Sequence, residues 1–491
     1  MSDPTIIVGG GLGGLAAAIH LAAAGQRVTL LEKNERLGGK AGLVSAAGYC
    51  FDTGPSLMTM PWILRGLYEA AGARLEEELT LIPLESTCRY RWPDGTTFEA
   101  YQILPLLMQE IARLEPRDVD GFLRFLAYTR RIYEAVAGPF LLNPFDGLRD
   151  LVNLRLVSDS WKIDSLRTVD AAVRSFFRSP YLRQVFNRYA TYNGSSPYRA
   201  PATFNIIPYV EFVEGGWYVR GGMYELVRAL ERLARRMGVA IHTGAEVAQI
   251  ELSGGAARGV RLAGGERLAA QAVVVNADPR YAYARLLPHS GAAARMQRLE
   301  PSCSGFVLLL GVDQRYDSLG HHNIFFSQDY PREFAAIFDR RVPPPDPTVY
   351  VCATSQTDPA LAPLGHMNLF VLVNAPATGR VNWAREGRPY RDLVLAKLRR
   401  MGLPDLEQHI AYEQIITPDD LEARYNAPGG AIYGLASNNP WSAFLRPPLR
   451  ARDAQRLYFV GGGTHPGGGI PLVLLSGRAV AQRVLADGKK H

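Results

Sequence analysis

A glycine-rich run near the start of the chain has the residue types and spacing of a dinucleotide-binding site. The run Gly-Gly-Gly-Leu-Gly-Gly satisfies the pattern G-x-G-x-x-G through Gly9, Gly11 and Gly14. Gly9 permits a tight turn, Gly11 lets the backbone approach a pyrophosphate, and Gly14 lets a helix lie close to a strand. Leu12 and Gly13 belong to the same turn, whose free backbone N–H groups would meet the pyrophosphate at a helix N-terminus.

Glu32 stands where an acidic residue completes this kind of site. Hydrophobic periodicity predicts a strand over Thr5–Val8, a helix over residues 12–24 and a second strand over Val28–Leu31. Glu32 closes the second strand, 18 residues after Gly14, so its carboxylate can accept hydrogen bonds from a ribose 2′-hydroxyl. It would repel a 2′-phosphate, which disfavours NADP. The alternative, a glycine-rich turn beside a surface glutamate, is disfavoured because strand, helix and acid occur together.

The residues after Glu32 bear on the choice between NAD and FAD, because the fingerprint fits both. Residues 32–40 (EKNERLGGK) resemble the extension after the second strand in FAD-dependent amine oxidases and carotenoid desaturases. In that family a glycine pair lets the chain turn beneath the cofactor diphosphate, and a cation follows. The resemblance therefore implies that Gly39 and Lys40 lie at the cofactor, with a solvated lysine as the alternative for Lys40.

Two shorter segments resemble the same family. Residues 51–55 (FDTGP) resemble the segment that passes near the flavin ring, which implies Gly54 and Pro55 as contacts. An ordinary turn is the alternative, since Asp, Gly and Pro favour turns in any protein. Glu246 and Val247 match the place where the family's backbone contacts the adenine, so Val247 is a further candidate, with an ordinary strand valine as the alternative.

A second glycine-rich loop lies near the end of the chain. Six glycines flank Pro466, between a predicted strand that starts at Leu457 and an apolar helix that runs to about residue 485. Pro471 suits the first turn of that helix. Such a loop would direct N–H groups and a positive helix end at a neighbouring group, here the N1/O2 edge of a flavin, which becomes anionic on reduction. We expect these residues of the loop at the cofactor: Gly462, Gly463, Gly469, Ile470 and Pro471.

With both ends considered, the chain resembles the bacterial carotenoid desaturases, of the phytoene desaturase or 1-hydroxycarotenoid 3,4-desaturase type, within the FAD-dependent amine oxidase-like superfamily. Residues 186–198 (FNRYATYNGSSPY) and 216–223 (GWYVRGGM) also resemble internal blocks of these enzymes, so the similarity runs nearly end to end. The resemblance implies FAD as cofactor. It implies an α/β fold in which a Rossmann-like FAD-binding domain, built from separated chain segments, carries an inserted mixed α+β substrate domain and a helical region.

The hydrophobic pattern along the chain suggests where the two expected domains begin and end. Residues 57–213 are rich in amphipathic helical stretches such as 103–114 and 119–136, which indicates a helical insertion. Later, strand-like runs precede a helical pattern at 390–401. No internal repeat or low-complexity linker is evident, so we expect interleaved domains. The FAD-binding domain is predicted to comprise residues 1–80, 215–280 and 440–491, and the substrate-binding and helical region residues 81–214 and 281–439.

The resemblance implies an FAD-dependent oxidoreductase that introduces C=C bonds into a carotenoid or related polyisoprenoid by hydride transfer to flavin N5. The ending at residues 468–478 (GGIPLVLLSGR) is nearer to 1-hydroxycarotenoid 3,4-desaturases than to the Gly-Ala-Gly-Ile-Pro-Gly form of many phytoene desaturases, which favours the hydroxycarotenoid branch. The alternatives are a phytoene-type desaturase, a carotenoid isomerase or a terminal oxygenase. Less favoured are a flavin amine oxidase and a nonenzymatic prenyl-binding protein. The electron acceptor would be oxygen or a quinone.

Catalytic side chains are not assigned by the sequence. A hydrocarbon substrate offers no charge or acidic proton, so a long apolar tunnel must recognise it. We find no Ser-His-Asp arrangement and no metal-ligand cluster. His465 lies in the second glycine-rich loop and is the one candidate for proton transfer, with a structural role as the alternative.

The charge and cysteine content of the chain indicate which partners and which cellular compartment to expect. The net charge of +7 and the pI near 9.2 come without a compact Lys/Arg run, so nucleic acid is not expected as a partner, whereas an anionic lipid surface is. Four cysteines in 491 residues are too sparse for a disulfide framework, which favours a reducing cytoplasm. The uncharged runs at 5–26 and 457–477 are broken by glycines and are not read as membrane spans, and no basic region precedes the first run as in a signal peptide.

A peripheral membrane contact is expected because a polyene substrate is almost insoluble in water. Residues 58–67 and 137–151 combine large apolar side chains with basic ones, as monotopic contacts do. The alternative is an apolar core beneath the substrate domain. The side chains concerned are Trp62, Phe140, Leu141, Leu142 and Phe145, with Arg65, Arg149 and Lys162 nearby.

Overall fold

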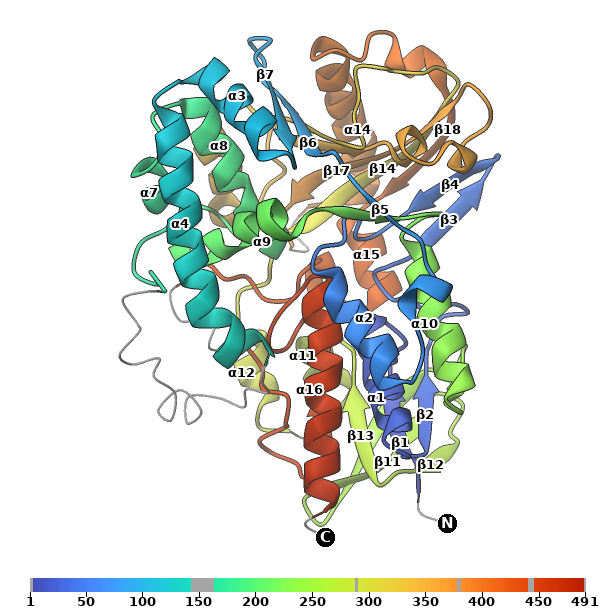
Figure 1. Ribbon diagram of the computed structural model, residues 1–491. Helices are drawn as coiled ribbons and strands as arrows, with labels where there is room; N and C mark the ends of the chain where they lie inside the picture. The colour runs from blue at the N-terminus through green and yellow to red at the C-terminus, as the bar shows by residue number, and fades with distance from the viewer. Residues whose placement is uncertain (1–2, 143–162, 288–289, 378–380, 440–445, 490–491) are drawn as a thin grey trace.

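The first sheet brings together strands from both ends of the chain. The computed structural model describes residues 3–142, 163–287, 290–377, 381–439 and 446–489. A five-stranded sheet has the order β19-β13-β1-β2-β9, and its neighbouring strands are parallel (Figure 1). Its strands are β1 (Thr5–Val8), β2 (Val28–Leu31), β9 (Ala240–His242), β13 (Ala272–Val275) and β19 (Leu457–Phe459). This arrangement confirms the α/β class with a parallel sheet.

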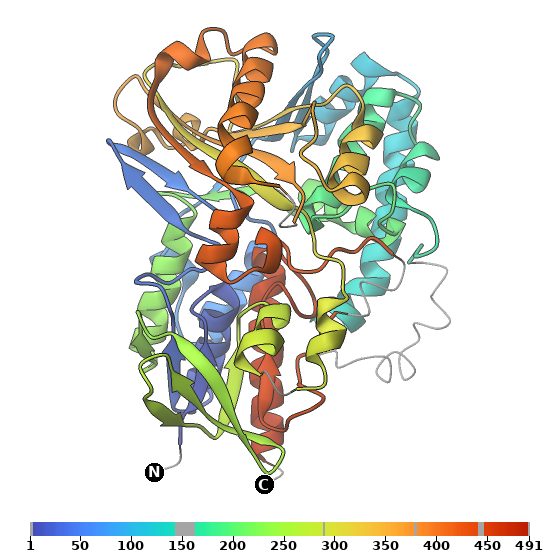
Figure 2. The same cartoon turned by 180° about the vertical axis from the view of Figure 1, so that it is seen from behind.

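Helices and a second sheet cover the two faces of this parallel sheet. On one face lie α1 (Leu12–Ala23), α2 (Pro61–Ala70), α10 (Tyr224–Arg236) and α16 (Ile470–Gly488), which share one hydrophobic core (Figure 1). On the other face lies an antiparallel sheet of β10 (Val247–Ser253), β11 (Ala256–Leu262) and β12 (Arg267–Ala269) (Figure 2). The parallel strands are consequently buried on both faces, as all-parallel sheets are.

The first and last helices of the fold pack closely at one glycine. A Cβ atom on Gly477 of α16 would lie 2.6 Å from the Cβ of Ala16 and 2.8 Å from the amide nitrogen of Ala17, both in α1. Such distances are shorter than real carbon contacts, so the helices approach this closely only because residue 477 has no side chain. The contact fixes the N-terminal turn of α16 beside the N-terminal turn of α1.

A seven-stranded sheet forms the other half of the molecule. Its order is β18-β14-β17-β16-β15-β6-β7, antiparallel except for the pair β15 and β6. One face packs on α14 (Trp383–Arg400) through a core that contains Trp383, Tyr390 and Val394. The strands are β6 (Ser86–Arg91), β7 (Thr97–Tyr101), β14 (Ser304–Val312), β15 (His322–Phe325), β16 (Val349–Cys352), β17 (Met367–Ala375) and β18 (Ile410–Ile416).

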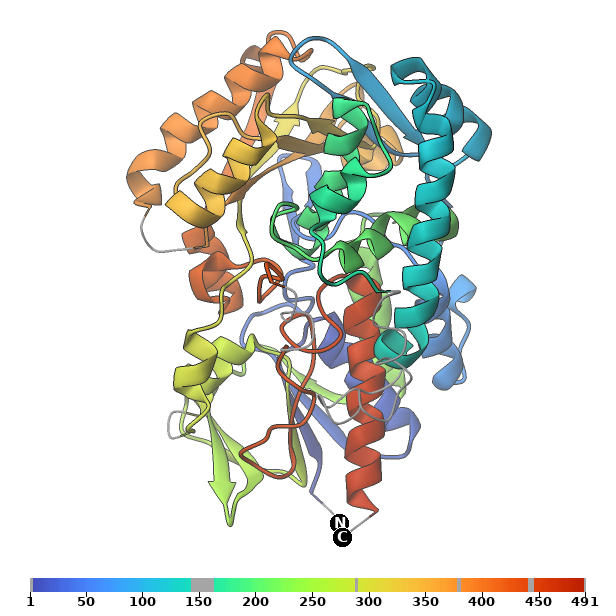
Figure 3. The same ribbon diagram turned by 90° about the vertical axis from the view of Figure 1, so that its left-hand side faces the viewer.

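A helical region flanks the seven-stranded sheet (Figure 3). Its core is aromatic, and the rings of Phe177 and Phe186 stack with centroids 4.3 Å apart. The helices are α3 (Leu104–Leu114), α4 (Asp118–Val136), α7 (Val169–Arg174), α8 (Pro180–Arg188) and α9 (Ile206–Glu214). The remaining elements are β3 (Leu43–Ala46), β4 (Tyr49–Asp52), β5 (Leu81–Pro83), β8 (Trp217–Val219), α11 (Pro279–Tyr281), α12 (Ala293–Gln297), α13 (Tyr330–Phe334), α15 (Pro418–Tyr425) and short 3-10 and π turns.

Two parts of the chain differ from the sequence expectation. The segment expected to be a helical insertion also contains the hairpin of β6 and β7, whose turn includes Pro93 and Gly95, the latter with φ +87°. The helix expected over residues 390–401 begins earlier, at Trp383, and carries Pro389 inside it. Asn382 caps this helix by accepting a hydrogen bond from the Arg385 amide, and Trp383, the first residue of the helix, is buried.

The division into two domains stays a prediction, although the strands of the parallel sheet lie in the segments expected for the FAD-binding domain.

None of the described helices is both long enough and apolar enough to span a membrane.

Candidate functional site

A cavity of about 630 Å³ lies at the carboxyl ends of the parallel strands and extends to the seven-stranded sheet. Ligands of open α/β sheets bind at this edge. Of the sixteen residues expected at the cofactor, all but Gly14 line the cavity: Gly9, Gly11, Leu12, Gly13, Glu32, Gly39, Lys40, Gly54, Pro55, Val247, Gly462, Gly463, Gly469, Ile470 and Pro471. The structure thus gathers residues from both ends of the chain around one space.

Gly14 does not line the cavity, but it lets the chain fold tightly next to it. A Cβ atom on Gly14 would collide with the carbonyl oxygen of Gly9, so only glycine lets α1 start this close to β1. Gly9 itself has φ +103°, in the region that glycine adopts without strain. These two glycines shape the turn that presents Gly11 to the cavity.

Asn276, which follows β13, joins the two glycine-rich loops. Its side-chain amide donates a hydrogen bond of 3.2 Å to the Gly9 carbonyl oxygen. A Cβ on Gly11 would lie 2.8 Å from Asn276 Nδ2, and a Cβ on Gly13 would lie 2.9 Å from Oδ1. A Cβ on Gly461 would collide with the same Oδ1. Sequence reasoning missed Asn276, for which the only signal was its place at the end of a buried strand.

Glu32 keeps room for a ribose hydroxyl although it is 95% buried, with a relative exposure of 5%. Its Oε2 accepts a 2.7 Å hydrogen bond from the Gly10 amide. Its Oε1 accepts hydrogen bonds from the backbone and side-chain nitrogens of Asn34, at 2.9 and 2.8 Å. A carboxylate offers about four lone-pair sites. Three are used, so Oε2 can accept one more hydrogen bond from the cavity.

Lys40 places its ammonium group in the wall of the cavity. Its Nζ donates to the carbonyl oxygens of Ala431 and Ile432, at 2.9 and 2.8 Å. An ammonium has three donors, so one remains for an anion. Burial lowers the pKa of Lys40, and the nearby carboxylate of Asp278 opposes this shift. The turn before Lys40 runs alongside the first loop, because Gly38 pairs with Gly11 in an isolated parallel bridge.

The N-terminus of α16 opens on the cavity. Gly469 precedes the helix with φ +109°, and no heavy atom lies within 4 Å of the position where its Cβ would stand. Free space at this position leaves the helix N-terminus accessible to a ligand. Two helix N-termini, those of α1 and α16, therefore face one cavity together with the Lys40 ammonium, which is a donor set that fits a diphosphate-bearing dinucleotide.

The part of the cavity near the seven-stranded sheet is mostly apolar. Val307, Ile324, Phe370 and Leu372 form its floor, and Ile207 and Val210 come from α9. Polar side chains interrupt it at a few places, and sequence reasoning singled out none of them: Ser56, Arg188, Tyr192, Glu211, His322 and Tyr350. Ser56 Oγ and Tyr350 OH are 2.5 Å apart, and Tyr350 OH lies 2.8 Å from His322 Nδ1.

His465 is not among the residues that line the cavity. It has a relative exposure of 3%, and its ring packs edge-on against Phe140 with centroids 4.4 Å apart. His465 Nε2 lies 2.7 Å from the carbonyl oxygen of Phe140, which can only accept, so this nitrogen carries a proton and donates it. These contacts are what the structural alternative expects, and a role of His465 in proton transfer stays a prediction.

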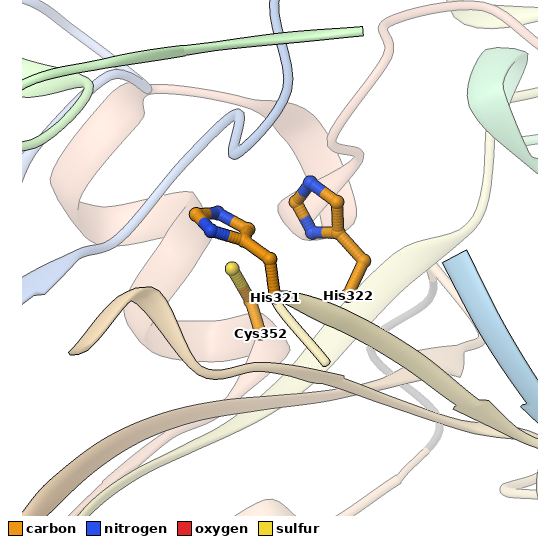
Figure 4. Close-up of side chains that lie close together, drawn as sticks. All are labelled: His321, His322 and Cys352. Carbon is orange, nitrogen blue, oxygen red and sulfur yellow. The ribbon is translucent and has the colours of Figure 1, made fainter. Parts of the chain in front are cut away.

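A group of polar side chains extends from the cavity wall at His322 to two residues that do not line the cavity, His321 and Cys352. His321, His322 and Cys352 are buried, and potential ligand atoms of the three lie within 4.8 Å of one another (Figure 4). Both Nδ1 atoms already pair with hydroxyls, His321 with Thr357 at 2.6 Å and His322 with Tyr350. Burial lowers the pKa of His321 to about 3 and raises that of Cys352 to about 12, so both are neutral. The adjacent pair of histidines was the only sequence signal for this cluster.

The side chains expected at a membrane do not share one surface. Trp62 is 38% exposed and donates a 2.7 Å hydrogen bond to Glu214. Phe140 is buried against His465, and Leu141 lines the cavity, so neither is a surface contact. Phe145, Arg149 and Lys162 lie outside the described residues. The membrane contact stays a prediction, in which Trp62 of α2 is the exposed apolar side chain.

The family model described as flavin containing amine oxidoreductase matches residues 12–485. The chain belongs to this family. Because the family binds flavin and the loop at Gly9, Gly11 and Gly14 is a dinucleotide fingerprint, the cofactor of this flavin oxidoreductase is FAD.

Two relatives match this chain over nearly its whole length, and both are named as oxygenases. The 4,4'-diapolycopene oxygenase of Methylomonas sp. is 40% identical over 487 residues, covering 98% of both chains. The 4,4'-diaponeurosporene oxygenase of Staphylococcus aureus strain MSSA476 is 37% identical over 495 residues, covering 100% of both. Among solved structures, an oxidoreductase of Methanosarcina mazei superposes with a TM-score of 0.63 at 19% identity, covering 98% of this chain and 100% of the other. That likeness concerns the fold.

Proposed function

We propose that this protein is an FAD-dependent oxygenase of acyclic carotenoid hydrocarbons. The support at the coarser level is full-length similarity to two enzymes whose names specify carotenoid substrates. The same names favour the terminal oxygenase among the alternatives considered above. The 1-hydroxycarotenoid 3,4-desaturase branch, which the C-terminal segment favoured, receives no support from these relatives.

The observation that carries the proposal is the continuity of the cavity. It runs from the glycine-rich loops, where Gly11 and Gly469 face the same space, to the apolar floor formed by residues such as Ile324 and Phe370. A hydrocarbon chain has no polar handle, so contact with apolar walls must position it. A carotenoid end held on this floor therefore lies in the space that also holds the cofactor.

The chain's own residues position the reactants and exclude water. The apolar floor replaces water around the hydrocarbon, and the helix N-termini at Leu12 and Ile470 favour negative charge on the cofactor. Bound FAD supplies the two-electron redox chemistry. In the proposed reaction one atom of O₂ enters a substrate C–H bond to give C–OH. The other atom leaves as water, with two electrons and two protons from an external two-electron donor.

Isotope labelling tests the proposal. FAD-loaded enzyme in detergent micelles, supplied with a reductant, an acyclic carotenoid hydrocarbon and ¹⁸O₂, should yield a product that carries ¹⁸O by mass spectrometry. Loss of two hydrogens without label would instead show a desaturase, and a product of unchanged mass an isomerase. Either outcome would overturn the oxygenase.

A further inference from the structure

A buried arginine in the wall of the apolar compartment has hydrogen-bond donors to spare. Arg188, the last residue of α8, has a relative exposure of 6% and lines the cavity. It forms no ion pair within 4.0 Å with any carboxylate in the described part of the chain. Among the described residues, its guanidinium donates only to the hydroxyl of Tyr192, from Nη2 at 3.2 Å and from Nη1 at 3.5 Å, and Nε has no partner.

Aromatic rings hold this guanidinium in place. Its central carbon lies 5.4 Å from the ring centroid of Tyr90, 5.2 Å from that of Tyr189 and 5.0 Å from that of Tyr192. Such cation–π contacts stabilise the cation without using its N–H groups. An arginine has five N–H donors in a planar fork, so most of them are left for another acceptor.

Glu211 fixes the rings without touching the arginine. Its Oε1 accepts from Tyr189 OH at 2.8 Å and its Oε2 from Tyr192 OH at 2.6 Å. Burial raises the pKa of both tyrosines well above the ordinary value, so their hydroxyls stay protonated and donate. The negative charge of Glu211 therefore balances Arg188 through Tyr192, and the fork remains open.

We propose that Arg188 binds a carbonyl oxygen carried by the polyene chain, so that the cavity recognises oxygenated carotenoids, polyene aldehydes and ketones, in addition to the hydrocarbon. This inference rests on the proposed function for the class of chain, and it adds a residue that distinguishes the oxygenated chain. A neutral carbonyl fits better than a carboxylate, because Glu211 lies one hydroxyl away and would repel a second negative charge.

Binding measured without oxygen tests the inference separately from turnover. FAD-loaded protein is titrated anaerobically with a linear polyene aldehyde, with the matching hydrocarbon and with the matching carboxylate, and absorption difference spectra are recorded. A hydrogen bond from a cation to the conjugated carbonyl shifts the aldehyde absorption to longer wavelength. We expect this shift with the wild-type protein. In Arg188→Met it should be lost, and the aldehyde affinity should fall about tenfold, the lower end for a hydrogen bond to a charged group. The hydrocarbon affinity should change less.

Two further variants keep the test decisive. Arg174→Met, which removes an exposed arginine of α7 whose side chain is 53% exposed, should change neither affinity nor spectrum. Arg188→Lys retains the charge but not the fork, so it should recover part of the shift, and it replaces Arg188→Met if that variant fails to bind FAD. An unchanged aldehyde shift in Arg188→Met, an equal loss for hydrocarbon and aldehyde, or tighter binding of the carboxylate would overturn the inference. Absence of ¹⁸O incorporation with the shift intact would overturn the oxygenase alone.

Discussion

At the scale of single residues, the cofactor site depends on positions where a side chain would take up space. Asn276 shows this most directly, because its amide lies against Gly11 and Gly13 of the first loop and Gly461 of the last. Any Cβ at these glycines meets the Asn276 amide or the cavity itself. The glycine pattern in the sequence is thus explained by a contact between segments that are far apart along the chain.

Gly11→Ala should weaken FAD binding. Its Cβ would lie 2.8 Å from Asn276 Nδ2, in the turn where we expect the backbone to face the pyrophosphate. Overpacking of this kind costs about 1–3 kcal/mol, so we expect a loss of affinity of about tenfold. Flavin fluorescence titration of the apoprotein measures it.

The matched control is Gly66→Ala in α2, where nothing lies within 4 Å of the new Cβ. That change should leave FAD affinity unaltered and stabilise the helix by about 0.5–1 kcal/mol. Wild-type FAD affinity in Gly11→Ala would show that the Gly11 turn does not contact the cofactor.

At the scale of elements, helix N-termini are held by groups from other parts of the fold. Asp52, at the end of β4, accepts hydrogen bonds from the amides of Met223 and Tyr224 at 2.8 and 2.9 Å and so caps α10. Burial raises the pKa of Asp52 to about 6, even though these hydrogen bonds favour the charged form. Desolvation is therefore the larger effect at this helix end.

Asp52→Asn should change how stability depends on pH. A carboxyl group whose pKa is higher in the folded state stabilises the protein when both states are protonated, below about pH 4, and that contribution is lost as the pH rises through 6. Relative to the variant, the wild-type free energy of unfolding should fall by up to about 3 kcal/mol between pH 4 and pH 7. Denaturant unfolding at several pH values measures this difference.

Because other carboxyl groups titrate in both proteins, only the difference between wild type and variant is informative. A difference that stays constant or grows with pH would contradict the raised pKa of Asp52.

At the scale of the whole molecule, the cavity lies between two sheets that draw on different segments of the chain. The parallel sheet supplies the glycine-rich loops, and the seven-stranded sheet supplies the apolar floor. If the proposed carotenoid is the substrate, we expect it to enter this cavity from a lipid phase, because a polyene is almost insoluble in water. The net charge of +7 favours an approach to anionic lipid headgroups.

Flotation with vesicles tests this approach. Without detergent, we expect the protein to float with anionic vesicles and not with neutral ones, and to be released by salt as charges are screened. Trp62→Ala should reduce flotation, because apolar contact adds to the electrostatic attraction. Leu364→Ala, at a fully exposed leucine before β17, is the control and should not. Protein that does not float with anionic vesicles would contradict the proposed membrane contact.

By itself, the sequence determined the local elements and the cofactor loops. The spacing of Gly9, Gly11 and Gly14 between a strand and a helix is a local pattern, and so is the loop before Pro471, because each records a backbone requirement within one turn. The periodicity that predicted α1 and α4 is local in the same way. It predicted α14 but placed its start too late, because Pro389 lies inside the helix. It missed the β6–β7 hairpin, whose pairing partner β15 lies far along the chain.

Only the tertiary structure decided which side chains meet in the cavity. The guanidinium of Arg188, the carboxylate of Glu211 and the imidazole of His322 come from α8, α9 and β15, and no spacing along the chain relates them. Likewise, the sequence placed His465 in the cofactor loop, whereas packing turned its ring toward Phe140. The physical reason is that backbone geometry is set by neighbouring residues, whereas the direction and partners of a side chain are set by what packs against it from elsewhere in the fold.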